Sequence, residues 1–207
     1  MSSTGVEIER KYDVDEGARM PDLTGLPRVV AADEPNGFDL DATYFDTPEL
    51  TLADRHVAVR RRVGGHDAGW HIKWPPQAEG RTEQQFPLGG EEVPAEVRAA
   101  LAELVGDAEL VPIARIRNHR VATVLRDAAG GALVELADDH VAATDLLHGV
   151  ERRWQEWEAE LLDAGSAGTA ADRAALLDAI EERLVAAGAR PASSGSKLAR
   201  ALGVSGR

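Results

Sequence analysis

The chain has 207 residues, 43% of them hydrophobic, which allows one large domain or two small ones with an ordinary globular composition. Its formal net charge of −13 argues against a nucleic-acid or anionic-membrane partner for the outer surface, and the lack of cysteine excludes disulfides and thiolate metal sites. No segment resembles a secretory signal or is long enough to span a bilayer, so we expect a cytoplasmic protein.

The hydrophobic pattern predicts a mainly β protein with a few helices. Strands are expected at 5–14, 28–34, 38–46, 56–63, 69–74, 81–87, 112–126, 132–144 and 150–162. Helices are expected at about 48–54, 94–105, 170–188 and 196–202. Long antiparallel strands with few helices favour a closed or nearly closed β architecture.

The first strand contains the sequence VEIERKY, in which polar and mostly apolar residues alternate. Residues two apart in a strand share a face, so Glu7, Glu9 and Lys11 point the same way. Arg10 is an exception on the apolar face, and we expect it to reach solvent or an outer helix. Taken alone, the pattern is typical of a half-buried strand with one solvated face.

Other predicted strands repeat this pattern and segregate by sign. The basic faces carry Arg60, Arg62, His71, Lys73, Arg115 and Arg117, and the acidic faces carry Glu7, Glu9, Glu135, Asp139, Glu156, Glu158 and Glu160. If the sheet closes with its apolar faces outward, these charges meet inside, which is costly unless ions of opposite sign fill the space. Carboxylates suit a divalent cation and arginine or lysine clusters suit phosphate, so the pattern predicts a bound metal–polyphosphate complex.

Lysine is rare in this chain. Only Lys11, Lys73 and Lys197 occur among 23 basic residues. Because a compact ammonium and a planar guanidinium are not interchangeable, these positions are candidates for a specific role. An arginine-rich coding background is the competing interpretation.

The ordered motifs resemble those of the CYTH superfamily, the triphosphate tunnel metalloenzymes. An E-x-E-x-K strand is formed by Glu7, Glu9 and Lys11, and YFDTPELTLADRHVAVRRR ends in the paired arginines. GWHIKWP, GRTEQQFPL, RIRNHR, WQEWEAEL and SSGSKLARAL follow in order. The resemblance covers nearly the whole chain, and all three lysines fall on its motifs.

This resemblance implies a single α+β, mostly antiparallel domain over 1–207. Eight strands would close into a β-barrel tunnel with helices packed outside, and a C-terminal helical segment at about 170–202 would pack on the barrel. Family members bind a triphosphate with Mg²⁺ or Mn²⁺, and we expect two ions per site. We expect a triphosphatase acting on inorganic triphosphate, with ATP or thiamine triphosphate as other substrates. An adenylate cyclase or a non-catalytic polyphosphate- or nucleotide-binding module is the alternative, and a monomer and a homodimer both stay open.

The resemblance also implies roles for individual residues. The metal ligands would be Glu7, Glu9, Glu135, Asp138, Asp139, Glu156, Glu158 and Glu160. The substrate contacts would be Lys11, Arg60, Arg62, Lys73, Arg81, Arg117, Arg120 and Lys197. The catalytic set would be Glu7, Glu9, Lys11, Lys73 and Glu158.

Three of these assignments stay open. Either Asp138 or Asp139 faces inward, depending on a bulge. Arg117 and Arg120 cannot share a face of a regular strand. Three glutamates of the last strand compete for two or three positions.

Overall fold

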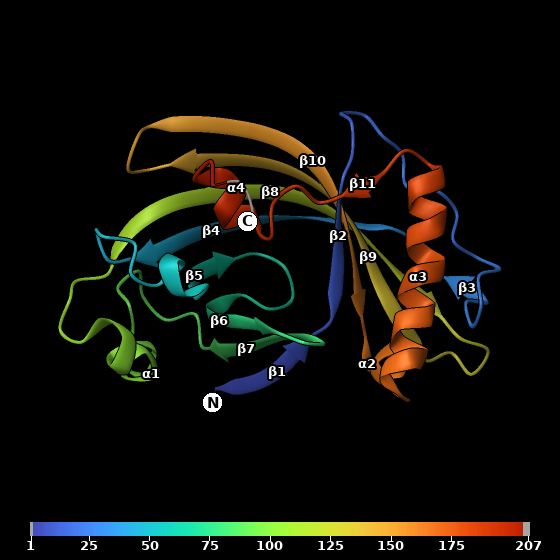
Figure 1. Ribbon diagram of the computed structural model, residues 1–207, viewed down its shortest axis with the longest axis horizontal. Helices are drawn as coiled ribbons and strands as arrows, with labels where there is room; N and C mark the ends of the chain where they lie inside the picture. Colours follow the sequence, from blue (N-terminus) through green and yellow to red (C-terminus); the bar gives the residue numbers. More distant parts are fainter. Residues whose placement is uncertain (1, 205–207) are drawn as a thin grey trace.

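The computed structural model describes residues 2–204 (Figure 1). Its strands are β1 (Ser3–Glu7), β2 (Glu9–Asp13), β3 (Ala31–Ala32), β4 (Asn36–Asp46), β5 (Ala58–Val63), β6 (Gly69–Gln77), β7 (Gly80–Phe86), β8 (Val111–Arg126), β9 (Ala132–Asp145), β10 (Val150–Leu161) and β11 (Arg190–Pro191). Its helices are α1 (Ala95–Val105), α2 (Asp163–Ser166), α3 (Ala170–Ala186) and α4 (Lys197–Ala201), with a 3₁₀ turn at Ala53–Arg55. No helix in residues 2–204 is long and apolar enough to cross a membrane.

All the strands belong to one antiparallel sheet. The hydrogen-bonded order is β1-β7-β6-β5-β4-β8-β9-β10-β2-β11, and β3 pairs with β8. In Figure 1 the long strands β4, β8, β9 and β10 arch over the shorter β5, β6 and β7. The predicted α+β, mostly antiparallel class is confirmed.

The predicted first strand is broken at Ile8. The part before it, β1, pairs with β7, and the part after it, β2, pairs with β10 near the other end of the sheet. The Ile8 carbonyl accepts a hydrogen bond from the backbone N–H of Leu161 (2.8 Å), but in residues 2–204 no ladder joins β1 to β10. The two ends of the sheet are therefore joined by the chain itself, and the predicted barrel closed by hydrogen bonds is not confirmed.

Helix α3 covers the outward face of β2, β9 and β10. Thr169 and Asp172 form a capping box at its start, and its residues Ile180 and Leu184 share a core with Tyr12 and Trp157. Arg10 is the charged exception on the outward face of β2. Its guanidinium forms ion pairs with carboxylates of α3, which explains its position.

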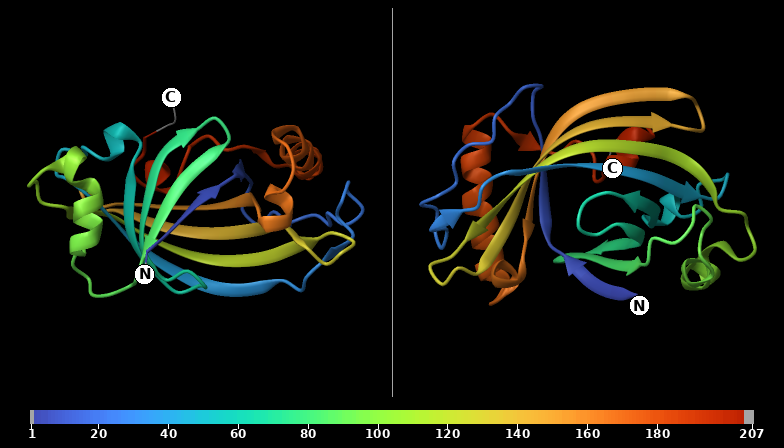
Figure 2. Two further views of the ribbon diagram at one scale, coloured as in Figure 1. Left: turned by 90° about the horizontal axis from the view of Figure 1, so that it is seen from below. Right: turned by 180° about the vertical axis from the view of Figure 1, so that it is seen from behind.

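Two further helices cover other parts of the sheet. Val97 and Leu101 of α1 share a core with Trp70 and Ile72 of β6. Figure 2 shows α1 and α3 at opposite ends of the molecule. The short helix α4 differs, because its residue Leu198 packs with inward-facing side chains of the arch and also lines the cavity described below. The resemblance implied that the helices pack outside the barrel, and α4 departs from that expectation.

Two predicted elements are shorter than expected. The strand expected at 28–34 is reduced to β3, and the helix expected at 48–54 is a loop that ends in the 3₁₀ turn. The buried carboxylate of Asp46 accepts hydrogen bonds from the backbone N–H groups of Thr47, Leu52 and Ala53, which holds this segment in a turn. The segments α2 and β11 were not expected from the sequence.

Candidate active site

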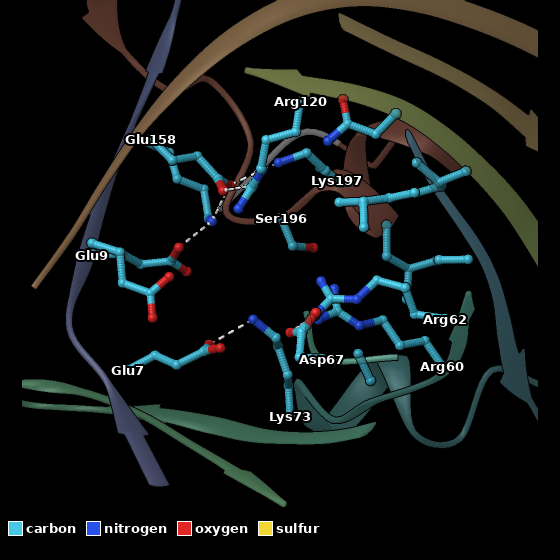
Figure 3. Close-up of a pocket in the computed structure, with 18 of the residues that line it drawn as sticks. Glu7, Glu9, Arg60, Arg62, Asp67, Lys73, Arg120, Glu158, Ser196 and Lys197 are labelled. Atoms are coloured by element: carbon cyan, nitrogen blue, oxygen red, sulfur yellow. Dashed lines mark hydrogen bonds and ion pairs between the residues drawn. The ribbon is translucent and has the colours of Figure 1, made fainter. Parts of the chain in front are cut away.

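The inward faces of the strands enclose a cavity of about 270 Å³. Most of the predicted site residues line it, namely Glu7, Glu9, Lys11, Arg60, Arg62, Lys73, Arg81, Arg120, Glu135, Glu158, Glu160 and Lys197. Figure 3 shows Glu7, Glu9 and Glu158 on one side, with Arg60 and Arg62 opposite. The cavity thus has an acidic wall and a basic wall that face each other.

Glu7 ends β1 and lies beside Lys73 of β6. The Lys73 ammonium is 2.5 Å from a Glu7 carboxylate oxygen and 3.7 Å from Glu83. Burial, together with a hydrogen bond to Glu83, raises the pKa of Glu7 to about 8. Burial also disfavours the charged form of Glu83, but hydrogen bonds from His71 and Glu7 outweigh it and hold the pKa of Glu83 well below its usual range.

Lys11 of β2 bridges two carboxylates of the acidic wall. Its ammonium is 2.6 Å from Glu9 and 2.5 Å from Glu158, which the antiparallel register places directly opposite Lys11. Burial opposes ionisation of Glu9, but the charge of Lys11 outweighs burial and lowers the Glu9 pKa. Both groups therefore carry their charges in the metal-free protein.

Lys197 begins α4 and points into a second group of carboxylates. Its ammonium is 2.7 Å from Asp139, 2.6 Å from Glu156 and 2.8 Å from Glu158. Oxygens of these three carboxylates lie within 4.8 Å of one another, and no other triple of potential metal ligands in residues 2–204 comes this close. Ser196 caps the helix by accepting from the Ala199 N–H, which fixes the point at which the lysine enters.

Arg120 of β8 is held by the same carboxylates. Its guanidinium donates to both oxygens of Asp139, at 2.8 and 2.7 Å, and to Glu158 at 2.5 Å. Such a bidentate pair fixes the plane of the guanidinium as well as its charge.

The basic wall has fewer anionic partners. Arg60 of β5 is 3.4 Å from Glu83 and 3.5 Å from the Tyr44 hydroxyl, and Arg62 pairs with Asp67. Burial and the neighbouring Arg60 lower the pKa of Arg62 to about 9. The Nε atoms of both arginines are buried and have no hydrogen-bond partner within residues 2–204. An anion in the cavity would supply the missing acceptors.

Arg81 and Glu160 also line the cavity, but their contacts differ from those of the residues above. Arg81 donates to the backbone carbonyls of Trp74 (2.5 Å) and His56 (2.7 Å), so its guanidinium also supports the cavity wall. Glu160 makes no ion pair among the described residues. Burial, together with the charge of Glu9, raises the pKa of Glu160 to about 7.

Asp138 and Arg117 lie outside the cavity, which corrects their predicted placement. The Asp138 carboxylate accepts from Gln155 (2.8 Å) and from the Trp157 indole (3.2 Å) on the outward face. Arg117 is exposed on the outward face of β8, because the regular register there turns Arg120 inward. The predicted basic face at 115–117 is therefore outside, where Arg115 pairs with Asp41 at 2.5 Å.

One part of the cavity is apolar, which was not predicted from the sequence. Phe38, Leu40, Ala42 and Tyr44, all on the inward face of β4, line it, and Asn118 of β8 lies opposite Leu40. Because residues two apart in a strand share a face, an inward Arg120 implies that Asn118 also points inward. The general expectation that apolar faces point outward does not hold for FDLDATYF, whose apolar face lines the cavity.

The sequence model of the CYTH domain matches residues 5–190. An uncharacterized protein of Mycobacterium tuberculosis strain H37Rv is 42% identical over 210 residues, which cover 96% of this chain and 40% of that protein. The chain thus spans about 40% of the length of this relative.

Two solved structures share the fold. A candidate adenylate cyclase from Bacillus halodurans has a TM-score of 0.61 at 21% identity, covering 95% of this chain and 97% of that one. The Hippeastrum protein HpAC1, a candidate adenylyl cyclase described as having a dominant triphosphatase activity, has a TM-score of 0.56 at 20% identity, with 93% of each chain covered. By its fold, its motif order and the extent of the domain match, this chain belongs to the CYTH domain family.

Proposed function

We propose that this protein is a divalent-metal-dependent triphosphatase that hydrolyses the terminal phosphoanhydride bond of a triphosphate, with inorganic triphosphate as the first substrate to test. The observation that carries the proposal is the pair of opposed walls within one cavity. A linear polyanion together with its cations is complementary to such a cavity, because each wall is then neutralised by the part of the complex that it faces.

The basic wall would hold the phosphate oxygens. Arg60 and Arg62 each have a buried Nε without an acceptor in the part of the chain that the structure describes, and Lys73 reaches into the space between the two walls. Phosphoryl transfer depends mainly on positioning and charge neutralisation, which these cations provide without forming a covalent intermediate. Arg120 and Lys197 would complete the set on the side of Glu158.

The acidic wall fits a hard divalent cation. Glu7, Glu9 and Glu160 offer carboxylate oxygens, and burial raises the pKa values of Glu7 and Glu160, so a bound cation would favour their ionised forms. Mg²⁺ and Mn²⁺ prefer such oxygen ligands. When bound, the ion would shield phosphate charge and lower the pKa of a coordinated water.

The Asp139, Glu156 and Glu158 group is the second candidate for a metal. Its oxygens are close enough together, but Lys197 already contacts all three residues. Lys73 and Lys11 contact Glu7 and Glu9 in the same way, but Glu160 makes no ion pair among the described residues, so we assign the first metal to the wall of Glu7, Glu9 and Glu160, with a second ion near Glu158.

The activity of one relative agrees with this choice. HpAC1 is described as having a dominant triphosphatase activity, and it shares this fold. The decisive experiment incubates the purified chain with inorganic triphosphate, ATP and thiamine triphosphate, each with Mg²⁺ or Mn²⁺, and measures phosphate and cyclic nucleotide. We expect metal-dependent phosphate release. Cyclic nucleotide from ATP would favour a cyclase, and tight binding without any product would favour a binding module.

A further inference from the structure

The amide of Asn118 is a polar group in the cavity that the proposed chemistry does not use. The side chain is on the inward face of β8, only 6% of the residue is exposed, and its Oδ1 is buried without a hydrogen-bond partner among the described residues. Buried polar groups in folded proteins are normally hydrogen-bonded, so an unpaired amide that lines a binding cavity is a candidate ligand contact.

The surroundings of Asn118 are mainly apolar. The register places it between Leu40 of β4 and Val141 of β9, and Ile116 precedes it on the same face. Leu198 of α4 lines the same cavity. This part of the cavity therefore offers little to a phosphate chain, but it suits an organic group.

An aromatic pair extends this apolar wall. Phe38 lines the cavity next to Leu40 on the inward face of β4, and its ring lies edge-to-face on His66, with centroids 5.6 Å apart at 64°. The β5–β6 loop packs closely here, because a Cβ at Gly65 would be 2.8 Å from Leu40 and 3.4 Å from Phe38. Ring faces and edges held in this way can contact a planar ring of a ligand.

The hydrogen-bonding character of Asn118 narrows the ligand class. The side-chain amide carries both a donor and an acceptor, and a fully ionised inorganic triphosphate could satisfy only the donor, which would leave the buried oxygen unpaired. Hydroxyl and amino groups on an organic substituent supply a donor to that oxygen. We propose that Asn118, with Phe38 and His66, forms a subsite for the organic group of a triphosphate ester, a nucleoside triphosphate being the type that combines a planar ring with hydroxyl groups. This inference rests on the proposed triphosphatase function.

The test compares two substrates in Asn118→Leu, which keeps the size of the side chain and removes its hydrogen bonds. We expect KM for ATP to rise about tenfold, the effect of one lost hydrogen bond, while kinetics with inorganic triphosphate stay within about twofold of wild type. Phe38→Leu should show the same selectivity. Arg117→Leu removes a neighbouring side chain on the outward face of the same strand. It is the matched control and should leave the kinetics with both substrates unchanged.

Other outcomes would overturn the inference. Equal losses with both substrates would show that Asn118 contacts the phosphate chain or stabilises the fold. Unchanged kinetics with both substrates would show that Asn118 does not contribute to substrate binding. If wild type hydrolyses no triphosphate, the proposed function fails. Calorimetric titration of wild type and Asn118→Leu with ATP and inorganic triphosphate then tests the subsite by itself, and equal Kd changes for the two ligands would refute it.

Discussion

Glu7 and Glu9 are separated by one residue, yet Glu7 is paired across the sheet with Arg81 of β7 and Glu9 with Glu160 of β10. The break at Ile8 lets both carboxylates point into the cavity from two different hydrogen-bond ladders. The acidic wall is therefore positioned from both ends of the sheet at once.

Replacing Glu9 by Gln should abolish metal-dependent phosphate release. The change removes a buried negative charge from the proposed metal site and keeps the shape of the side chain, so we expect a loss on the order of 100-fold or more. Initial rates of phosphate release measure it, and circular dichroism checks the fold. Glu151→Gln, an exposed position on β10, is the control. Near-normal turnover in Glu9→Gln would refute the assignment.

Replacing Lys73 by Ala should mainly weaken substrate binding. The Lys73 ammonium is held by Glu7 at the boundary of the two walls, where it would contact a phosphate oxygen in both the ground state and the transition state. We therefore expect KM to rise more than kcat falls, which steady-state kinetics with inorganic triphosphate will show. A fall in kcat at unchanged KM would instead give Lys73 a role in the transition state alone.

The metal-free protein should lose stability as the pH rises from 6.5 to 8. Burial raises the pKa of Glu7 to about 8 and that of Glu160 to about 7, so the folded state binds more protons than the unfolded state in this range. The free energy of unfolding then falls with rising pH until these groups ionise in the folded state too. The opposing contribution of His71, whose pKa burial lowers to about 4, develops mainly between pH 4 and 6.5 and levels off above pH 6.5.

Thermal melting in a chelator at pH 6.5, 7.2 and 8 tests this pH dependence. Glu7→Gln and Glu160→Gln should each flatten the profile, and added Mg²⁺ or Mn²⁺ should raise Tm in wild type most strongly at pH 8, where the carboxylates are ionised. A wild-type slope that survives both substitutions would assign the pH dependence to other groups.

Gly80→Ala should destabilise the fold by displacing the end of β1 that carries Glu7. A Cβ at Gly80, where φ is +151°, would lie 2.5 Å from the backbone oxygen of Glu7. We expect a loss of about 1–3 kcal/mol in the free energy of unfolding, from the unfavourable backbone angle and the displaced strand end. Denaturant titration measures it. Gly90→Ala, where a Cβ meets nothing within 4 Å, should be nearly neutral, and equal effects of the two changes would contradict this explanation.

Arg10→Ala should destabilise the fold without changing the chemistry. Arg10 pairs with Asp178 (2.6 Å) and Glu181 (3.0 Å) of α3 on the outward face, and its side chain is 30% exposed. Partly exposed ion pairs contribute up to about 1 kcal/mol, so we expect a loss of that size in chemical denaturation and an unchanged KM. An altered KM would show that α3 influences the cavity.

Much of the fold followed from the period-two pattern. The long strands β8, β9 and β10 were predicted almost to their ends, because each has a buried outward or inward face that fixes its alternation. The break at Ile8 could not be seen in that pattern. Glu7 and Glu9 keep the same inward direction on both sides of it, so the alternation continues although the pairing partner changes.

The errors in the site have a related cause. β8 carries polar side chains on both faces, so its sequence does not tell whether Arg117 or Arg120 is inside. The adjacent Asp138 and Asp139 pose the same problem, which only the register with β10 resolves. Asn118 was missed because a single amide adds nothing to a pattern of charges. Its significance depends on the unpaired oxygen, which is a property of the packed structure.

The passage at Ile8 also has a mechanical consequence. Ladders of hydrogen bonds can slide or separate, but a covalent chain cannot, so the Cα atoms of Glu7 and Glu9 stay within about 7 Å of each other whatever the cavity contains. The loop that carries His66 and Asp67 on the opposite side has no such tether to β2. The chain therefore sets the spacing of these two carboxylates, whereas only hydrogen-bond ladders set the spacing between the acidic and basic walls.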